Sequence, residues 1–234
     1  MDASRTGAAD STRDRIVVAA AGLLAEGGRE AVSTRAVCAA AGVQAPAIYR
    51  LFGDKQGLLD AVASHGFSAY LNDKTDLKPS DDPVEDLRSG WDLHVGFGLA
   101  NPAVYALMYG EPRPGAAAPA AVAAAGILAA HIRRVAETGR LRVSEERAAQ
   151  LVHAAGSGTT LSLIAMPEDR RDLALSDLAR EAVISAITTG APVPATPGPV
   201  GAAVALRATL PQTTVLSTQE QGLLREWLDR IARS

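Results

Sequence analysis

The stretch from Ser33 to Leu59 constrains the fold more than any other part of the sequence, because it contains two short helical patterns in close succession. Ser33 is a good N-cap for the first helix, since its hydroxyl can accept a hydrogen bond from a first-turn backbone N–H. This helix is expected to end at Gly42. The second helix opens between Gln44 and Pro46, where proline is tolerated because first-turn N–H groups have no partner within the helix. The pattern is typical of a helix-turn-helix, whose second helix enters the DNA major groove.

A further helix is expected on each side of this pair. Before it, Ser11 or Thr12 can cap a helix that ends at Gly27-Gly28, and residues 1–10 are expected to be a disordered tail. The apolar residues of that helix fall on one stripe at helical spacing, namely Ile16, Ala19, Ala20, Leu23 and Leu24. After the pair, a helix begins beyond Gly53 with Asp54 as its cap. Residues 11–62 therefore predict a three-helix DNA-binding domain followed by this connecting helix.

The rest of the chain, residues 63–234, predicts a larger helical domain. Its pattern is helical again after a polar link, and we expect helices over residues 84–99, 102–109, 120–138, 144–165, 173–188 and 217–233. Four prolines and two glycines between Thr189 and Pro199 indicate a loop, which we place at about 189–212. The predicted fold class is all-α.

Composition supports this fold class and indicates the cellular compartment. Apolar residues make up 47% of the 234 residues but aromatic residues only 4%, which favours closely packed helices over sheets. No apolar run reaches the roughly 18 to 20 residues that a membrane span needs, and the polar N-terminus lacks the pattern of a secretory signal. Cys38, the single cysteine, cannot form an internal disulfide. A cytoplasmic protein with no membrane partner is expected.

The charge balance is unusual for a DNA-binding domain. Residues 1–60 carry seven basic and seven acidic side chains, and the whole chain has a formal charge of −3. A basic footprint is the usual mark of a protein that binds DNA. Attraction to phosphate is therefore expected to come from helix N-termini and a few well-placed side chains.

The exposed residues of the two helices suggest specific roles. Gln44 can hydrogen-bond a base edge, while Ala45 and Pro46 offer apolar contact to a thymine methyl. The remaining candidates are suited to phosphates: Tyr49 and Arg50 on the second helix, Lys55 on the helix that follows, and Ser33 and Thr34 at the start of the first. Most of these contacts would position the protein, so specificity would depend on Gln44, methyl contacts and DNA shape.

The segment Ala41-Gly42-Val43-Gln44-Ala45-Pro46-Ala47-Ile48-Tyr49-Arg50-Leu51-Phe52-Gly53-Asp54-Lys55, followed by Leu58-Leu59, resembles the DNA-binding domain of the TetR family of one-component regulators. The Gly-Val pair, the Tyr-Arg-x-Phe group and the Lys-x-x-Leu-Leu group stand at the family's spacings. The sequence departs from the commonest pattern at Gln44, where the family often has Ser or Thr. The resemblance covers about residues 12–62.

This resemblance implies a homodimer that binds a near-palindromic operator and is released by a small molecule, most often as a repressor. The family's last two long helices usually form the dimer interface, and here these are about residues 145–165 and 173–188. Ordinary packing within one chain is the alternative for their small-residue stripe. Residues 98–110 also resemble relatives with a WHG-type C-terminal domain, in which Ser157-Gly158 would stand in the place of His-Gly.

A ligand pocket needs a mostly apolar wall with a few polar groups. The candidate residues for such a pocket are Trp91, His94, Phe97, Tyr105, Met108 and His153, although each by itself is more often a core or surface residue. The four histidines do not stand at metal-ligand spacings, so no metal and no cofactor is expected beyond an unidentified effector.

The sequence bears on two other classes of protein. An enzyme is disfavoured because the chain lacks a Gly-rich phosphate loop, a Gly-x-Ser-x-Gly elbow, a His-Glu-x-x-His helix and paired cysteines. The alternative is a helical interaction module with a degenerate DNA-binding half, which the neutral charge of residues 1–60 supports. The operator, its target genes, the effector and the sign of regulation are not encoded in any pattern of the chain.

Overall fold

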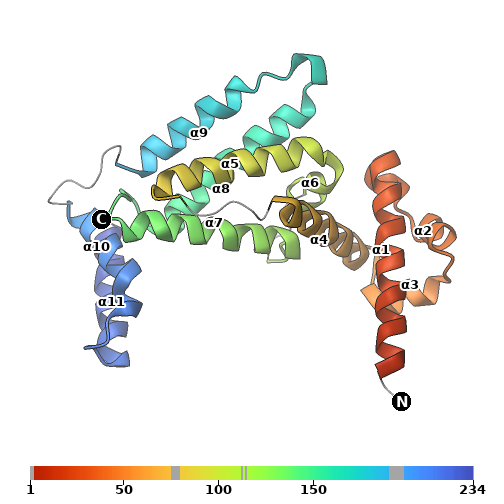
Figure 1. The fold of residues 1–234 in the computed structure, drawn as a ribbon, viewed down its shortest axis with the longest axis horizontal. Coiled ribbons are helices and arrows are strands. Elements are labelled where there is room, and N and C mark those ends of the chain that lie inside the picture. Colours follow the sequence, from red (N-terminus) through yellow and green to blue (C-terminus); the bar gives the residue numbers. More distant parts are fainter. Residues whose placement is uncertain (1–2, 75–79, 112, 114, 190–197, 234) are drawn as a thin grey trace. The chain divides into compact units, whose positions relative to one another are not determined.

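The computed structural model describes residues 3–74, 80–111, 113, 115–189 and 198–233, and over these residues the chain is α-helical (Figure 1). The β-type pairing in this part of the chain is one isolated antiparallel bridge, between Leu141 and Thr188. The chain divides into two compact units: residues 1–77 with 97–123, and residues 78–96 with 124–234.

The first unit contains the predicted helix-turn-helix. Its helices are α1 (Ala3–Ala31), α2 (Thr34–Ala41), α3 (Ala45–Phe52), α4 (Lys55–Lys74) and α6 (Pro102–Tyr109). Helix α1 packs on α2, α4 and α6, while α3 packs on α2 and α4. Their shared core is made by apolar side chains that are at most 3% exposed: Ile16, Val17, Ala20, Leu24, Val37, Ile48, Leu58, Leu59 and Val62.

The first helix begins earlier than predicted. We expected residues 1–10 to be a disordered tail and the helix to be capped at Ser11 or Thr12, but α1 starts at Ala3. The alanines of this segment have the highest helix propensity, and extending an existing helix costs far less than nucleating one. Met1 and Asp2 lie outside the described residues.

The predicted break at the other end of this helix is confirmed. Gly27 and Gly28 leave helical geometry, and Gly28 has a φ of 65°, which glycine adopts without a steric cost.

The boundary between the units differs from the predicted division at residue 62. Helix α6 belongs with the DNA-binding helices because it packs on α1 and α4. At the contact with α4, the side chain of Val104 fills the space beside Gly66, where a β-carbon would lie 3.1 Å from it. Sequence periodicity could not reveal this association, because it identifies helices but not their partners.

The second unit contains residues 83–96 of α5 (Pro83–Ala100), most of α7 (Pro119–Glu137), and the helices α8 (Glu145–Ala165), α9 (Ala174–Ile187), α10 (Pro199–Thr209) and α11 (Thr218–Ala232). Short 3-10 turns lie at Glu168–Arg170 and Leu210–Gln212. Helix α8 packs on α9, and α10 packs on α11 (Figure 1). The predicted helices of this region are confirmed to within one or two residues at each end.

Helix α10 overturns part of the predicted loop. We placed an irregular segment at about 189–212, but residues 199–212 are helical. Pro199 stands in the first turn of α10, where it needs no N–H partner, and the alanine-rich run after it favours a helix. Residues 190–197, which hold three of the four prolines between Thr189 and Pro199, lie outside the described residues.

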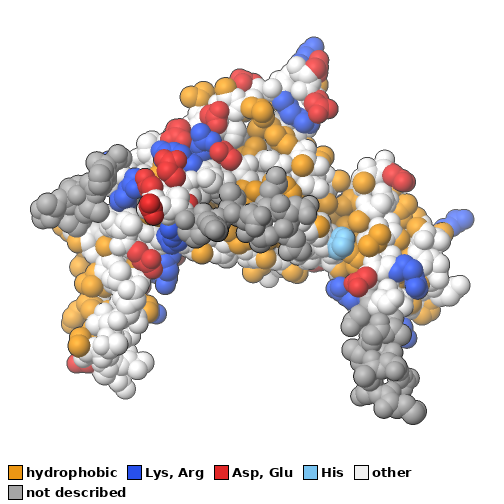
Figure 2. Space-filling view, viewed as in Figure 1, with side chains coloured by type: hydrophobic (Ala, Val, Ile, Leu, Met, Phe, Trp, Pro, Cys, Tyr) orange, Lys and Arg blue, Asp and Glu red, His pale blue; other side chains and the backbone are white. Residues whose placement is uncertain are grey.

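Ion pairs tie α5 to α9 within the second unit. Figure 2 shows acidic and basic side chains intermingled over these helices. Arg88 of α5 binds Glu181 of α9 through two guanidinium nitrogens, at 2.8 and 2.9 Å. Arg180 of α9 pairs in turn with Asp92 of α5. Among the helices that the structure describes, none combines the length and the hydropathy that a bilayer crossing requires.

Candidate nucleic-acid interface

The start of α2 carries the first predicted DNA contacts. Ser33 is the N-cap, and its Oγ accepts a hydrogen bond of 3.1 Å from the backbone N–H of Ala36. This bond uses the hydroxyl as an acceptor, so its proton can still be donated. Ser33 is exposed and Thr34 is half-buried. Both residues are therefore placed where a helix N-terminus attracts an anion.

The turn between the two helices is closed by glycine, as predicted. Gly42 has φ 65° and ψ 39°, a left-handed conformation that favours glycine, and its N–H bonds the carbonyl of Cys38. Gln44 then becomes the N-cap of α3, but its side chain makes no capping hydrogen bond. The exposed amide of Gln44 is therefore left for a contact outside the helix.

Helix α3 has one buried and one exposed face. Ile48 is 1% exposed and anchors the helix in the core, whereas the neighbouring Tyr49 is 54% exposed. Pro46 and Arg50 are exposed as well, and Ala45 is half-buried. The structure thus presents the predicted contact residues of α3 to solvent.

The start of α4 carries Lys55, the last of the predicted contacts. Asp54 caps this helix as predicted, because its Oδ1 accepts a 2.7 Å hydrogen bond from the N–H of Gly57. Lys55 is exposed in the first turn. Its ammonium group is therefore beside a helix N-terminus, and both attract phosphate.

The structure partly explains how a domain with no net charge can attract DNA. Two of the acidic side chains make hydrogen bonds within the protein. Asp54 caps α4, and Asp60 accepts from both terminal nitrogens of Arg113 at 2.9 and 3.2 Å. Arg50 and Lys55, in contrast, form no ion pair with any described residue. The charges of Arg50 and Lys55 are therefore not neutralised by any described ion pair, although the capped Asp54 keeps its own negative charge next to Lys55.

Sequence reasoning missed a polar network that links these helices to the segment after α6. Arg29 pairs with Glu111 at 2.9 Å and donates to Gln56 at 3.2 Å. Gln56 donates to Asp60 at 2.9 Å, and Asp60 receives Arg113. No local signal could reveal this network, because Asp60 and Arg113 are 53 residues apart.

The predicted ligand-binding residues fall into two groups, one in each unit. In the second unit, the ring of His94 and the indole of Trp91 lie against Gly156, where a β-carbon would be 3.5 to 3.6 Å from them. The Nε1 of Trp91 donates to the Oγ of Ser176 at 3.0 Å. His153 is exposed, and its Nδ1 lies 3.5 Å from the hydroxyl of Ser157.

The electrostatics of this group keep His94 neutral. Burial, together with the nearby His153, lowers the pKa of His94 to about 4. A charged imidazole is disfavoured there because the surrounding side chains cannot solvate it.

The other group belongs to an aromatic cluster of the first unit. The ring centroids of Phe97 and Tyr105 are 6.2 Å apart, and those of Tyr105 and Tyr109 are 4.7 Å apart. Phe67 and Tyr70 of α4 also pack on Phe97. Tyr105 is fully buried and Met108 is 6% exposed. Burial raises the pKa of Tyr109 above its usual value.

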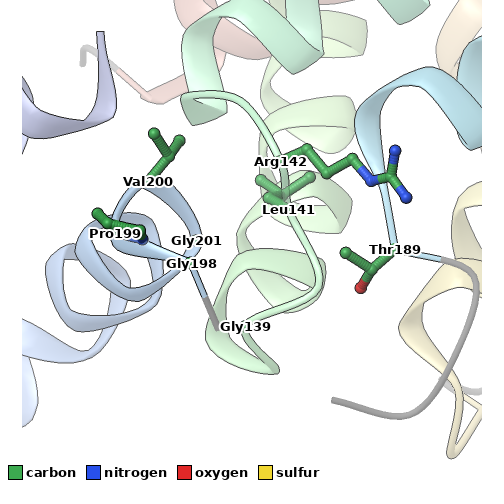
Figure 3. Close-up of a pocket in the computed structure, with 8 residues that line it drawn as sticks. All are labelled: Gly139, Leu141, Arg142, Thr189, Gly198, Pro199, Val200 and Gly201. Carbon is green, nitrogen blue, oxygen red and sulfur yellow. The ribbon is translucent and has the colours of Figure 1, made fainter. Parts of the chain in front are cut away.

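A cavity of about 280 Å³ lies elsewhere in the second unit (Figure 3). Its walls come from the turn after α7, the end of α9 and the start of α10: Gly139, Leu141, Arg142, Thr189, Gly198, Pro199, Val200 and Gly201. None of the predicted ligand-binding residues lines it. Its volume is at the lower limit of the roughly 300 to 1,000 Å³ typical of ligand sites.

The part of the chain that the structure describes holds no group of three or more His, Cys, Asp and Glu side chains that could bind a metal. Cys38 is half-buried on α2.

These features define a transcription regulator that carries a helix-turn-helix DNA-binding domain. The helix-turn-helix domain belongs to the TetR family: residues 16–62 match the model of the bacterial regulatory proteins of the tetR family. No curated protein matches the chain.

Solved structures share the fold well beyond the matched residues. A TetR-family transcriptional regulator from Agrobacterium tumefaciens is 22% identical, with a TM-score of 0.52, and the match covers 77% of this chain and 100% of that one. A protein of unknown function from Rhodococcus sp. RHA1 is 22% identical, with a TM-score of 0.62, over 76% of this chain and 96% of that one. The multidrug binding protein EbrR, complexed with imidazole, is 26% identical, with a TM-score of 0.52, and the match covers 79% of this chain and 97% of that one.

Proposed function

We propose that this protein is a ligand-responsive repressor that binds a near-palindromic operator as a homodimer and is released by a small molecule. The observation that carries the proposal is the outward face of α3, where Gln44, Tyr49 and Arg50 are exposed while Ile48 is buried. A helix that is anchored on one side and polar on the other can enter the major groove without disturbing its own domain.

The contacts divide into base readout and backbone positioning. Gln44 would hydrogen-bond a base edge, and Ala45 with Pro46 would contact a thymine methyl. Tyr49, Arg50 and Lys55 would bind phosphates, joined by the hydroxyl groups of Ser33 and Thr34. Since Gln44 is the only one of these residues that we assign to a hydrogen bond with a base edge, modest sequence specificity from direct contacts is expected.

Exposed leucines on α8 and α9 support the proposed dimer. Leu151 of α8 is 44% exposed, Leu173 at the N-cap of α9 is 56% exposed, and Leu178 of α9 is 72% exposed. Contiguous exposed apolar side chains mark interaction sites, and we propose that these leucines contribute to one. In the dimer, two recognition helices must reach half-sites about 34 to 36 Å apart, or a multiple of this spacing, so a small swing of either would release the DNA.

The effector is proposed from the family and from one relative. TetR regulators respond to small molecules, and EbrR, 26% identical to this chain, is a multidrug binding protein whose structure contains imidazole. The residues predicted from the sequence remain two separate sets of candidates: Trp91, His94 and His153 in the second unit, and Phe97, Tyr105 and Met108 in the first. A regulator of this kind would act in the cytoplasm without enzymatic activity.

The experiment that tests the proposal is selection of genomic fragments from the source organism by the purified protein at about 150 mM salt, since binding to phosphate depends steeply on salt. Enrichment of a near-palindrome is expected. A folded dimer that enriches no sequence, with and without extracts of small metabolites, would contradict the proposal. That result would favour a helical interaction module with a degenerate DNA-binding half.

A further inference from the structure

Two arginines of α1, outside the helix-turn-helix, are fixed at the two ends of the recognition helix α3. We infer that Arg13 and Arg15 bind DNA phosphates on either side of that helix, an inference that rests on the proposed DNA-binding function. The observation behind it is that each side chain is fastened to a defined atom or ring of another helix.

Arg13 is held at the C-terminal end of α3. Its guanidinium carbon lies 5.3 Å from the centre of the ring of Phe52, the last residue of α3. A guanidinium that stacks on an aromatic face keeps its N–H groups at the edges of its plane. The donors of Arg13 therefore stay available for an anion while its position is fixed by the ring.

Arg15 is held at the N-terminal end of the same helix. Its Nε donates a 3.1 Å hydrogen bond to the carbonyl oxygen of Ala41, the last residue of α2. Only the turn Gly42-Val43-Gln44 separates that carbonyl from the start of α3. Arginine has five N–H donors, so the four on the two terminal nitrogens remain for another acceptor.

The length of α3 is close to the width of the major groove, as this arrangement requires. Eight residues at about 1.5 Å per residue give a helix of roughly 12 Å, and the major groove is also about 12 Å wide. Each end of the helix therefore lies near a row of phosphates when the helix is in the groove. Arginine is well suited to these positions because its planar fork matches the geometry of phosphate oxygens.

No described carboxylate neutralises these two charges, because both side chains are exposed and neither forms an ion pair with a described residue. Together with Arg50 and Lys55 they give four cations around α3. This placement supplies the attraction to phosphate that the balanced charge of residues 1–60 does not.

The test is the salt dependence of DNA binding by Arg13→Gln and Arg15→Gln. Glutamine keeps a polar chain with an N–H donor but removes the charge, so the fold should persist, and this is checked by the unfolding midpoint. Affinity is measured between about 50 and 200 mM KCl on the selected operator and on an unrelated duplex. Arg225→Gln, which changes an exposed arginine of α11, is the matched control.

Each variant should reduce the slope of log K against log salt by about 0.9, the value for one lost phosphate contact. The loss of affinity should be the same on the operator and on the unrelated duplex, because phosphate contacts carry no sequence information. An unchanged slope in a folded variant, or a loss confined to the operator, would overturn the inference while the proposed function stands. If the unaltered protein binds neither duplex, the proposed function itself fails, and the inference fails with it.

Discussion

Asp60 of α4 accepts hydrogen bonds from both terminal nitrogens of Arg113, at 2.9 and 3.2 Å, although 53 residues separate the two. Both side chains are less than a quarter exposed. Truncating one partner of a half-buried pair leaves the other charge without compensation. We expect Arg113→Ala to lower the free energy of unfolding by about 1 to 2 kcal/mol, measured by urea denaturation.

A double-mutant cycle separates this pair from unrelated effects of truncation. Asp60→Asn combined with Arg113→Ala should cost less than the sum of the single variants, because the second change removes a charge that is already unpaired. Arg233→Ala is the control, since this side chain is 71% exposed and lies 3.9 Å from Asp229. Strict additivity of the two changes would show that the ion pair contributes no coupling.

The hydrogen bond between Trp91 and Ser176 joins α5 to α9 in the interior of the second unit. Ser176→Ala removes the hydroxyl that accepts the hydrogen bond of the buried indole N–H, which should lower the free energy of unfolding by about 1 to 3 kcal/mol. Ser185→Ala, a change at an exposed position of α9, should have little effect. Unfolding can be followed by fluorescence, because Trp91 is 4% exposed and should shift its emission strongly as it becomes solvated.

Stability should fall as the pH falls below the ordinary pKa of histidine. His94 has a pKa of about 4 in the folded protein, against 6.5 for an unperturbed group, because burial disfavours its charged form. The unfolded chain therefore binds a proton more readily than the folded one between pH 6.5 and 4. Across that window the loss attributable to His94 is on the order of 3 kcal/mol at 1.36 kcal/mol per pKa unit.

His94→Gln should flatten this part of the pH profile. Burial also lowers the pKa of His131, so the difference between the two proteins is the relevant measurement, obtained from urea midpoints at a series of pH values. Parallel profiles for the two proteins would show that His94 is accessible to protons in the folded state.

The local rules of helix formation were sufficient to predict most elements, and they failed where two local signals conflict or where association in three dimensions decides the result. The cap at Ser33, the helix end at Gly42 and the cap at Asp54 are all local, and all are confirmed. The early start of α1 and the helix α10 were not predicted, because the polar residues and prolines of these segments indicate irregular structure while their alanines favour a helix.

The candidate ligand residues show the same limit. Trp91 and Phe97 stand on the same helix, but they belong to different compact units, and Phe97 joins the tyrosines of α6. Aromatic residues and histidines identify what a pocket can contain, but a sequence does not say which of them converge. For the same reason no sequence signal placed a cavity beside Leu141 and Arg142.

Replacing the most exposed leucine of α9 tests the proposed dimer. Leu178 is 72% exposed, so Leu178→Asp should leave the fold intact and place a charge in the proposed interface. A shift from dimer to monomer is expected by sedimentation velocity at micromolar concentration. Val215→Asp, at an 85% exposed position outside α8 and α9, is the control. A dimer that persists in Leu178→Asp would show that the interface lies elsewhere.

The predicted phosphate contacts can be separated from a merely structural role of the same residues. Tyr49 is 54% exposed on α3 and Lys55 is exposed at the start of α4, so neither replacement by alanine should destabilise the domain. Each should weaken operator binding by about 10-fold, which corresponds to 1.4 kcal/mol. Tyr49→Phe removes only the hydroxyl, so it should show the full loss if that group donates to phosphate and little loss if the ring alone makes the contact. Affinities that stay at the level of the unaltered protein in both alanine variants would mean that α3 meets the DNA through a different face.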